Sequence, residues 1–197
     1  LLQARRIVFA SSSAVYGNTA AYYKKEGEEG RVTSPYGLTK WQNEKMAQLI
    51  HQHLDISYAG LRFFNVYGPG QKMSKQNSAV IPHMINSEKI VINGDGKATR
   101  DFVFIKDACA AIKQAILSNE SFICNVGTGR PTSINELAEL LAGGKDIVHV
   151  QERVGDILNS VASTELMEEK LGWLPVVSLE EGLQFTQKYY ADLKRKS

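Results

Sequence analysis

The sequence predicts an α/β fold built around a parallel β-sheet. Residues 7–11 form a short apolar run of strand-forming residues, and residues 56–64 form a second run of the same kind. Between them, residues 35–53 show the periodicity of an amphipathic helix. A strand, a long helix and a strand over roughly sixty residues are typical of parallel strands joined by a crossover helix.

The long helix has a well-defined predicted start. Ser34 can cap its N-terminus and Pro35 fits the first turn, where a missing N–H costs nothing. Its apolar stripe is marked by four residues: Trp41, Met46, Leu49 and Ile50. Such a stripe is normally the face that a helix buries against its neighbours.

After Gly70 the pattern changes to shorter elements. We expect helices over residues 79–87, 106–117, 133–141 and 164–171 and from residue 178 onward, and strands over residues 90–92, 102–104 and 122–126, with an extended segment near Val148. Capping-box spacing at residues 133–136 and 178–181 supports two of the helix starts. The chain shows no internal repeat or low-complexity segment.

The composition excludes several classes of function. Lys and Arg number 23 against 21 Asp and Glu, a formal net charge of +2, so nucleic acid and anionic membranes are not expected partners. Cys109 and Cys124 are too few for a disulfide framework, and their apolar surroundings predict that both are buried. No eighteen-residue apolar run and no metal-ligand spacing among the histidines is found, so we expect a cytoplasmic protein without a metal site.

Tyr36 and Lys40 form the most informative pair in the chain. They stand four residues apart at the predicted helix start, and therefore on one face. An ammonium beside a phenol stabilises the phenolate, which can act as a general base toward a hydroxyl group. This spacing is weak evidence alone, but it follows a strand that ends in Ser11, Ser12 and Ser13.

Seven motifs in order extend this pattern. They are SSSAVYG at residues 11–17, SPYGLTK at 34–40, LRFFNVYGP at 61–69, NGDG at 93–96, TRDF at 99–102, NVGTG at 125–129 and RVGD at 153–156. With them the chain resembles the extended short-chain dehydrogenase/reductase family, and within it the nucleotide-sugar 4-epimerases of the UDP-glucose/UDP-N-acetylglucosamine type. The resemblance implies a Rossmann-type parallel sheet, partial here, with a smaller C-terminal α/β substrate domain.

The resemblance also implies roles for individual residues. Tyr36 would be the catalytic base, Lys40 would hold the nicotinamide ribose of NAD, and Ser12 would hydrogen-bond the substrate O4. Ser11 and Phe63 would complete the cofactor contacts on this side. NAD would take up and return the hydrogen at C4 of a UDP-hexose through a 4-keto intermediate.

The substrate contacts implied by the family are more widely spread. Asn65, Arg100 and Arg153 would clamp the pyrophosphate, since guanidinium groups bind phosphate oxygens bidentately. The remaining contacts would come from Ser13 and Ser160 near the sugar, Asp156 beside Arg153, and Val80, Val91 and Asn93 near uracil. Each arginine has an alternative interpretation as a surface residue paired with a neighbouring aspartate, Asp101 or Asp156.

Two positions discriminate among reactions within this family. Ser13 and Ala14 stand where related dehydratases and decarboxylases carry acidic residues, so epimerisation is favoured. Ser160 stands at a position bordering the sugar C2 substituent, where a small side chain leaves room for an N-acetyl group. We therefore expect N-acetylated UDP-sugars to fit as well as UDP-glucose and UDP-galactose.

The family's glycine-rich dinucleotide turn is not found in these 197 residues. Tight junctions at residues 3–6 and 142–146 suggest that segments are missing at these points. We assign residues 1–70 to the remainder of an NAD-binding domain and residues 71–197 mainly to a nucleotide-sugar domain, with about 98–128 returning to the first.

Two other functions stay open. The protein could be a different epimerase or a reductase of the same family. If the chain is complete, it could instead be an inactive nucleotide-sugar-binding remnant. The family implies a homodimer formed through the helix that carries Tyr36 and Lys40.

Overall fold

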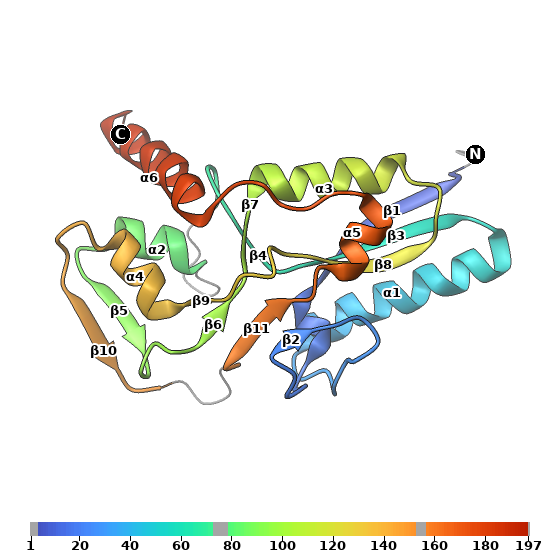
Figure 1. The fold of residues 1–197 in the computed structure, drawn as a ribbon, viewed down its shortest axis with the longest axis horizontal. Helices are drawn as coiled ribbons and strands as arrows, with labels where there is room; N and C mark the ends of the chain where they lie inside the picture. Colours follow the sequence, from blue (N-terminus) through green and yellow to red (C-terminus); the bar gives the residue numbers. More distant parts are fainter. Residues whose placement is uncertain (1–3, 73–78, 153–156, 197) are drawn as a thin grey trace.

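The computed structural model describes residues 4–72, 79–152 and 157–196 (Figure 1). Its elements in chain order are β1 (Arg6–Ser12), η1 (Ser13–Tyr16), β2 (Tyr23–Lys24), α1 (Pro35–Leu54), β3 (Ser57–Phe63), β4 (Asn65–Tyr67), α2 (Val80–Asn86), β5 (Ile90–Asn93), β6 (Thr99–Arg100), β7 (Phe102–Phe104), α3 (Ile105–Leu117), β8 (Phe122–Val126), β9 (Thr132–Ser133), α4 (Ile134–Ala142), β10 (Ile147–Val150), β11 (Asn159–Ala162), α5 (Glu165–Leu171) and α6 (Leu179–Lys196).

The predicted parallel sheet is confirmed. Strands β1, β3 and β8 pair in parallel in the order β1-β3-β8, with β3 in the centre. Helix α1 lies along one face of this sheet, while α3 and α5 cover the other (Figure 1). A buried cluster that includes Leu61, Cys124 and Met167 joins the sheet to α3 and α5. The fold is therefore α/β with a Rossmann-type sheet.

The second half of the molecule is built from smaller sheets. Strands β5 and β10 pair in parallel, β4 pairs with β7, and β2, β11, β6 and β9 form a four-stranded sheet between the two halves (Figure 1). Helices α2, α4 and α6 pack around a separate buried cluster that includes Ile92, Phe104 and Leu137. The assignment of domains at residue 70 stays a prediction.

The predicted apolar stripe of α1 is not the buried face of the helix. Trp41, Met46 and Leu49 are 37%, 59% and 50% exposed. The side chains that α1 buries are instead Glu44 and Ala47. The expectation from periodicity was wrong because the helix presents a carboxylate, and not its large apolar residues, to the sheet.

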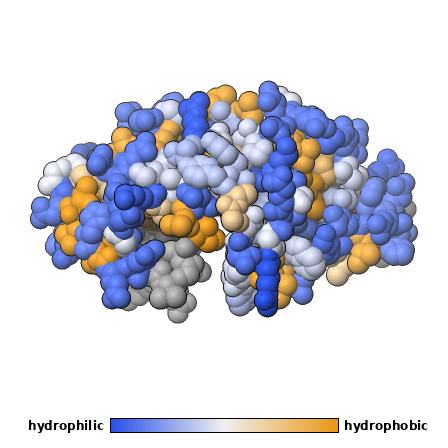
Figure 2. Space-filling model, turned by 60° about the horizontal axis from the view of Figure 1, so that its bottom comes forward, coloured by the Kyte–Doolittle hydropathy of each residue, from blue (hydrophilic) through white to orange (hydrophobic). Residues whose placement is uncertain are grey.

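The two cysteines differ in their exposure to solvent. Cys124 is buried as expected, but Cys109 is exposed on α3, so the prediction was wrong for that residue. On the face seen in Figure 2, hydrophobic side chains gather in separate groups within a mostly hydrophilic surface. Over the described ranges, no helix has both the length and the apolar character needed to cross a bilayer.

Candidate active site

The start of α1 is organised by its predicted cap. The Ser34 hydroxyl accepts a hydrogen bond from the Gly37 N–H at 3.0 Å, and Pro35 occupies the first turn. This places Tyr36 on the surface with 56% of it exposed. The Lys40 ammonium lies 5.6 Å from the centre of the Tyr36 ring, so the structure brings the predicted pair together.

Lys40 also ties the helix to the first strand. Its ammonium donates a hydrogen bond to the Ala10 carbonyl at 3.0 Å. Ala10 lies two residues before the end of β1, at the carboxyl edge of the parallel sheet. This edge is where open α/β sheets bind their ligands. The ammonium keeps two further N–H donors for other partners.

The three serines at the end of β1 have different surroundings. Ser12 caps η1, and its hydroxyl oxygen accepts a hydrogen bond from the Ala14 N–H at 3.2 Å, which leaves its O–H able to donate. Ser13 begins η1 and is half-buried. Ser11 is 2% exposed, and its hydroxyl donates to Glu44 inside the molecule. The side chain of Ser11 is therefore used by the protein itself.

Helix α1 and η1 are in unusually close contact. A Cβ atom added to Gly37 would lie 2.7 Å from the Ala14 carbonyl oxygen. Only glycine allows the backbones to approach this closely without a shift. The contact brings the first turn of α1, with Tyr36, against the segment that begins with Ser13.

Burial distinguishes Tyr36 from two other tyrosines of the region. Burial raises the pKa of Tyr16 and the pKa of Tyr67 above their ordinary values. The Tyr16 hydroxyl donates to the Asn125 side chain at 2.6 Å, and the Tyr67 hydroxyl donates to the Leu179 carbonyl. Both phenols therefore stay protonated and donate hydrogen bonds within the protein. Tyr36, in contrast, is exposed beside the serine-ended strand.

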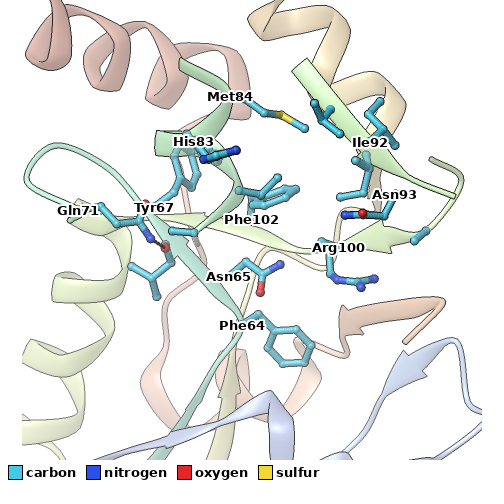
Figure 3. A pocket seen from close by; sticks show the side chains of 17 residues that line it. Phe64, Asn65, Tyr67, Gln71, His83, Met84, Ile92, Asn93, Arg100 and Phe102 are labelled. Carbon is cyan, nitrogen blue, oxygen red and sulfur yellow. Dashed lines mark hydrogen bonds between the residues drawn. The ribbon is translucent and has the colours of Figure 1, made fainter. Parts of the chain in front are cut away.

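A cleft of about 580 Å³ opens in the second half of the molecule, beyond the end of β3 (Figure 3). It is lined by Phe64, Asn65, Val66, Tyr67, Gln71, Ala79, Val80, Ile81, His83, Met84, Val91, Ile92, Asn93, Ala98, Arg100, Phe102 and Ile134. These residues include five predicted substrate contacts: Asn65, Val80, Val91, Asn93 and Arg100. Tyr36, Lys40 and Ser12 lie outside this lining.

The two parts of the site meet around Phe63 and Phe64. Phe63 ends β3 and packs, partly buried, against the core of the sheet. Phe64 lines the cleft and also packs in one cluster with Val15 and Tyr16 of η1. The predicted catalytic end of β1 and the cleft are thus connected through Phe64, the residue between β3 and β4.

In Figure 3 the Arg100 side chain lies between those of Asn93 and Asn65. The Arg100 guanidinium donates to the Thr99 carbonyl at 2.9 Å and to the Leu158 carbonyl at 3.4 Å. Ser160 pairs with Arg100 across β11 and β6, although it is not part of the cleft lining.

Asp101 is not the partner of Arg100, so that alternative is wrong. The Asp101 carboxylate is fully buried and accepts hydrogen bonds from Thr128, Gly129 and Ala162. Burial raises the pKa of Asp101, and these hydrogen bonds limit the rise. The carboxylate therefore joins the strand of Arg100 to the end of β8 and to β11. Arg153 and Asp156 lie outside the described residues.

Sequence reasoning missed several residues of the cleft. His83 lies on α2 one turn after Val80 and lines the cleft, and helical periodicity could have found it. Gln71 and Phe102 also line the cleft, but nothing in their sequence context indicates it. Sequence reasoning also missed the buried ion pair of Glu44 and Arg62, which lies against the predicted catalytic helix.

Comparisons with known proteins agree with this geometry. The model of the NAD dependent epimerase/dehydratase family matches residues 2–127. A UDP-glucose 4-epimerase of Mycolicibacterium smegmatis is 32% identical in an alignment 200 residues long, and the match covers 94% of this chain and 62% of the relative.

Two solved structures are similar along almost the whole chain. The UDP-N-acetylglucosamine 4-epimerase of Methanobrevibacter ruminantium M1, in complex with UDP-N-acetylmuramic acid, superimposes with a TM-score of 0.92 at 33% identity. The UDP-glucose 4-epimerase of Thermotoga maritima, with UDP-glucose, gives a TM-score of 0.89, also at 33% identity. Each comparison covers 96% of this chain and 64% of the other.

The chain thus spans somewhat under two thirds of the length of the proteins it matches. The matched family model covers more than half of the chain and includes the paired Tyr36 and Lys40, the serine-ended strand and the strand of Arg100. The chain therefore belongs to the NAD dependent epimerase/dehydratase family.

Proposed function

We propose that the whole protein catalyses the NAD-dependent epimerisation of a UDP-hexose at C4. The observation that carries the proposal is the arrangement of Tyr36 and Lys40 at the end of β1, with the Lys40 ammonium 5.6 Å from the phenol ring and 3.0 Å from the Ala10 carbonyl. An exposed phenol held beside a cation is suited to take a proton from a sugar hydroxyl.

The residues present fit the nicotinamide-ribose end of NAD. The two N–H donors that Lys40 keeps match the hydroxyl pair of a ribose, and the exposed ring of Tyr36 leaves space beside them. Phe63, at the end of β3, would border the same place. When bound, NAD supplies the acceptor and the donor for the C4 hydrogen and its electron pair.

In the proposed reaction, Tyr36 removes the O4 proton as C4 is oxidised and returns it as C4 is reduced. Lys40 stabilises the phenolate before the first step and after the second, and Tyr36 holds the proton in between. The Ser12 hydroxyl, which can donate while it accepts from Ala14, orients O4 toward Tyr36. Rotation of the 4-keto sugar between the two steps exposes its other face and inverts the configuration at C4.

The cleft would hold the UDP group and keep the 4-keto sugar attached. Arg100 and Asn65 would bind the pyrophosphate, and Val80, Val91 and Asn93 would enclose the base. Arg153 keeps its predicted role in the same clamp, and Asp156 its predicted contact with the substrate. A tethered intermediate makes the return step unimolecular, which favours completion over release.

The sugar itself is the less determined part of the proposal. Ser13 would contact the sugar from η1, and Ser160 would leave room for an N-acetyl group at C2. We propose that UDP-glucose, UDP-galactose and their N-acetylated forms are all accepted. A cytoplasmic location and a homodimer complete the proposal.

The test uses the full-length protein and a panel of four UDP-sugars: the gluco and galacto forms, each with and without the N-acetyl group. Chromatography of the products should show interconversion within both pairs. The protein should also release NAD on denaturation. Bound NAD with no conversion of any of the four sugars would exclude the 4-epimerase proposal. Conversion of the non-acetylated pair alone would exclude the role given to Ser160.

A further inference from the structure

A buried ion pair lies beneath the catalytic helix. Glu44 on α1 is 1% exposed and Arg62 on β3 is 5% exposed. The Arg62 Nε donates to Glu44 Oε1 at 2.9 Å, and one of its terminal nitrogens donates to Glu44 Oε2 at 2.8 Å. This is the bidentate geometry of a strong arginine–carboxylate contact.

The position of Glu44 on the helix connects this pair to the proposed chemistry. Glu44 follows Lys40 by four residues and Tyr36 by eight, so the three residues lie on one side of α1. Glu44 also accepts a hydrogen bond from the Ser11 hydroxyl. Glu44 therefore attaches the catalytic helix to β3 through the ion pair and to β1 through Ser11.

Two consecutive residues of β1 each form a hydrogen bond with a side chain of this helix. The Ala10 carbonyl accepts from Lys40, and the next residue, Ser11, donates to Glu44 one helical turn further along. Ser11 and Arg62 are register partners in β1 and β3, so the helix is held at the same level by two strands. Ser12, the proposed O4 ligand, comes next in β1.

Arg62 extends the attachment to the neighbouring segments. Its guanidinium forms a second ion pair with Glu29, in the loop that precedes α1. It also lies 4.9 Å from the centre of the Tyr16 ring in η1. Burial alone would lower the pKa of Arg62, but its hydrogen bonds and the charge of Glu44 raise it, so the group stays charged.

Stability alone does not account for this network. Burying two charges carries a desolvation cost that their attraction often only offsets, and an apolar pair of similar size is frequently as stable. What a charged bidentate pair adds is a fixed distance and orientation between the elements it joins. These elements are the helix that carries Tyr36 and β3, and β3 is paired along its length with β1, the strand that ends in Ser12.

We propose that Glu44 and Arg62 are positioning residues, which fix Tyr36 and Lys40 relative to Ser12 and thereby set the rate of proton transfer. The proposal rests on the 4-epimerase function proposed above. Neither residue touches the substrate. Since a displacement of about 1 Å can reduce a rate about 100-fold, loss of the pair lowers kcat. UDP binding is kept, because neither residue lines the cleft.

The test compares Glu44→Gln and Arg62→Lys with a control of similar stability. Met167→Ala serves as the control, because Met167 is fully buried on α5, away from the catalytic helix. For the two test variants we expect kcat to fall about 10- to 100-fold with the Kd for UDP unchanged. Met167→Ala should lower Tm but leave kcat and the Kd for UDP as in the wild type.

A readout without turnover separates the two proposals. Hydrogen exchange of the amides of residues 38–44 should be faster in Glu44→Gln than in Met167→Ala when measured at equal distance below Tm. Unchanged exchange, or a kcat loss that Met167→Ala reproduces, would overturn the positioning role. A wild-type protein without turnover would remove the epimerase proposal, and the exchange data would still decide whether the pair anchors the helix.

Discussion

At the scale of single residues, the candidate site is held in shape by buried polar groups that hydrogen-bond several segments of the chain. Asp101 shows this most clearly, because its carboxylate accepts from the N–H groups of Thr128, Gly129 and Ala162 and from the Thr128 hydroxyl. Its own backbone carbonyl accepts from the Asn65 N–H at 2.9 Å. One buried residue thus connects both proposed pyrophosphate ligands, Arg100 and Asn65, to the end of β8.

Asp101→Asn should be strongly destabilising. The amide nitrogen would face N–H donors, and at least one buried donor would lose its partner, at a cost of about 3 kcal/mol. We expect the free energy of unfolding in urea to fall by about this amount. Asp95→Asn is the matched control, since Asp95 is exposed in a surface turn and bonds the Lys97 N–H. Equal stability of the two variants would contradict the role given to Asp101.

At the scale of elements, the sequence predicted where helices and strands begin and end better than it predicted which of their faces are buried. The bounds of β8 and the cap of α1 agree with the structure, because both depend on local signals: a β-rich run and a Ser-Pro start. The buried face of α1 could not be predicted in this way. Glu44 is buried only because Arg62, eighteen residues later, and Ser11 meet it in the fold.

The same limit applies to the cleft. Its predicted members came from motifs of a resembled family, and not from periodicity. Gln71 and Phe102 reach it from separate segments that only the tertiary structure brings together. Arg153 and Asp156 remain predictions.

The contact between α1 and η1 gives a prediction at the element scale. A methyl group at Gly37 would meet the Ala14 carbonyl at 2.7 Å, so Gly37→Ala must move the helix start away from η1. We expect a loss of about 1–3 kcal/mol in the free energy of unfolding and a clear loss of kcat.

Gln42→Ala, at an exposed position of the same helix, is the control for this variant and should leave both quantities nearly unchanged. Wild-type turnover by Gly37→Ala would show that the close contact does not position Tyr36.

At the scale of the whole molecule, the exposed apolar face of α1 has a consequence for assembly. Trp41, Met46 and Leu49 present large apolar side chains to solvent on the helix that carries the proposed catalytic residues. Apolar groups of this kind are typical of interaction surfaces. They support the proposed homodimer, whose interface would then lie on the helix that carries the proposed catalytic residues.

The double variant Met46→Glu and Leu49→Glu should therefore be monomeric, because two added charges per subunit would repel across a symmetric contact. Sedimentation velocity of the full-length protein measures this directly. Leu193→Glu, on the exposed side of α6, should leave the dimer intact. A dimer that survives the double variant would place the interface elsewhere.

The most direct test of the account is the Tyr36→Phe variant of the full-length protein, assayed with UDP-glucose and by UDP titration. The substitution removes one hydroxyl from an exposed ring, so folding and UDP binding should be unchanged. The account predicts that epimerisation falls by at least about 100-fold while the Kd for UDP stays at its wild-type value. Wild-type turnover by Tyr36→Phe would contradict the assignment of Tyr36 as the base.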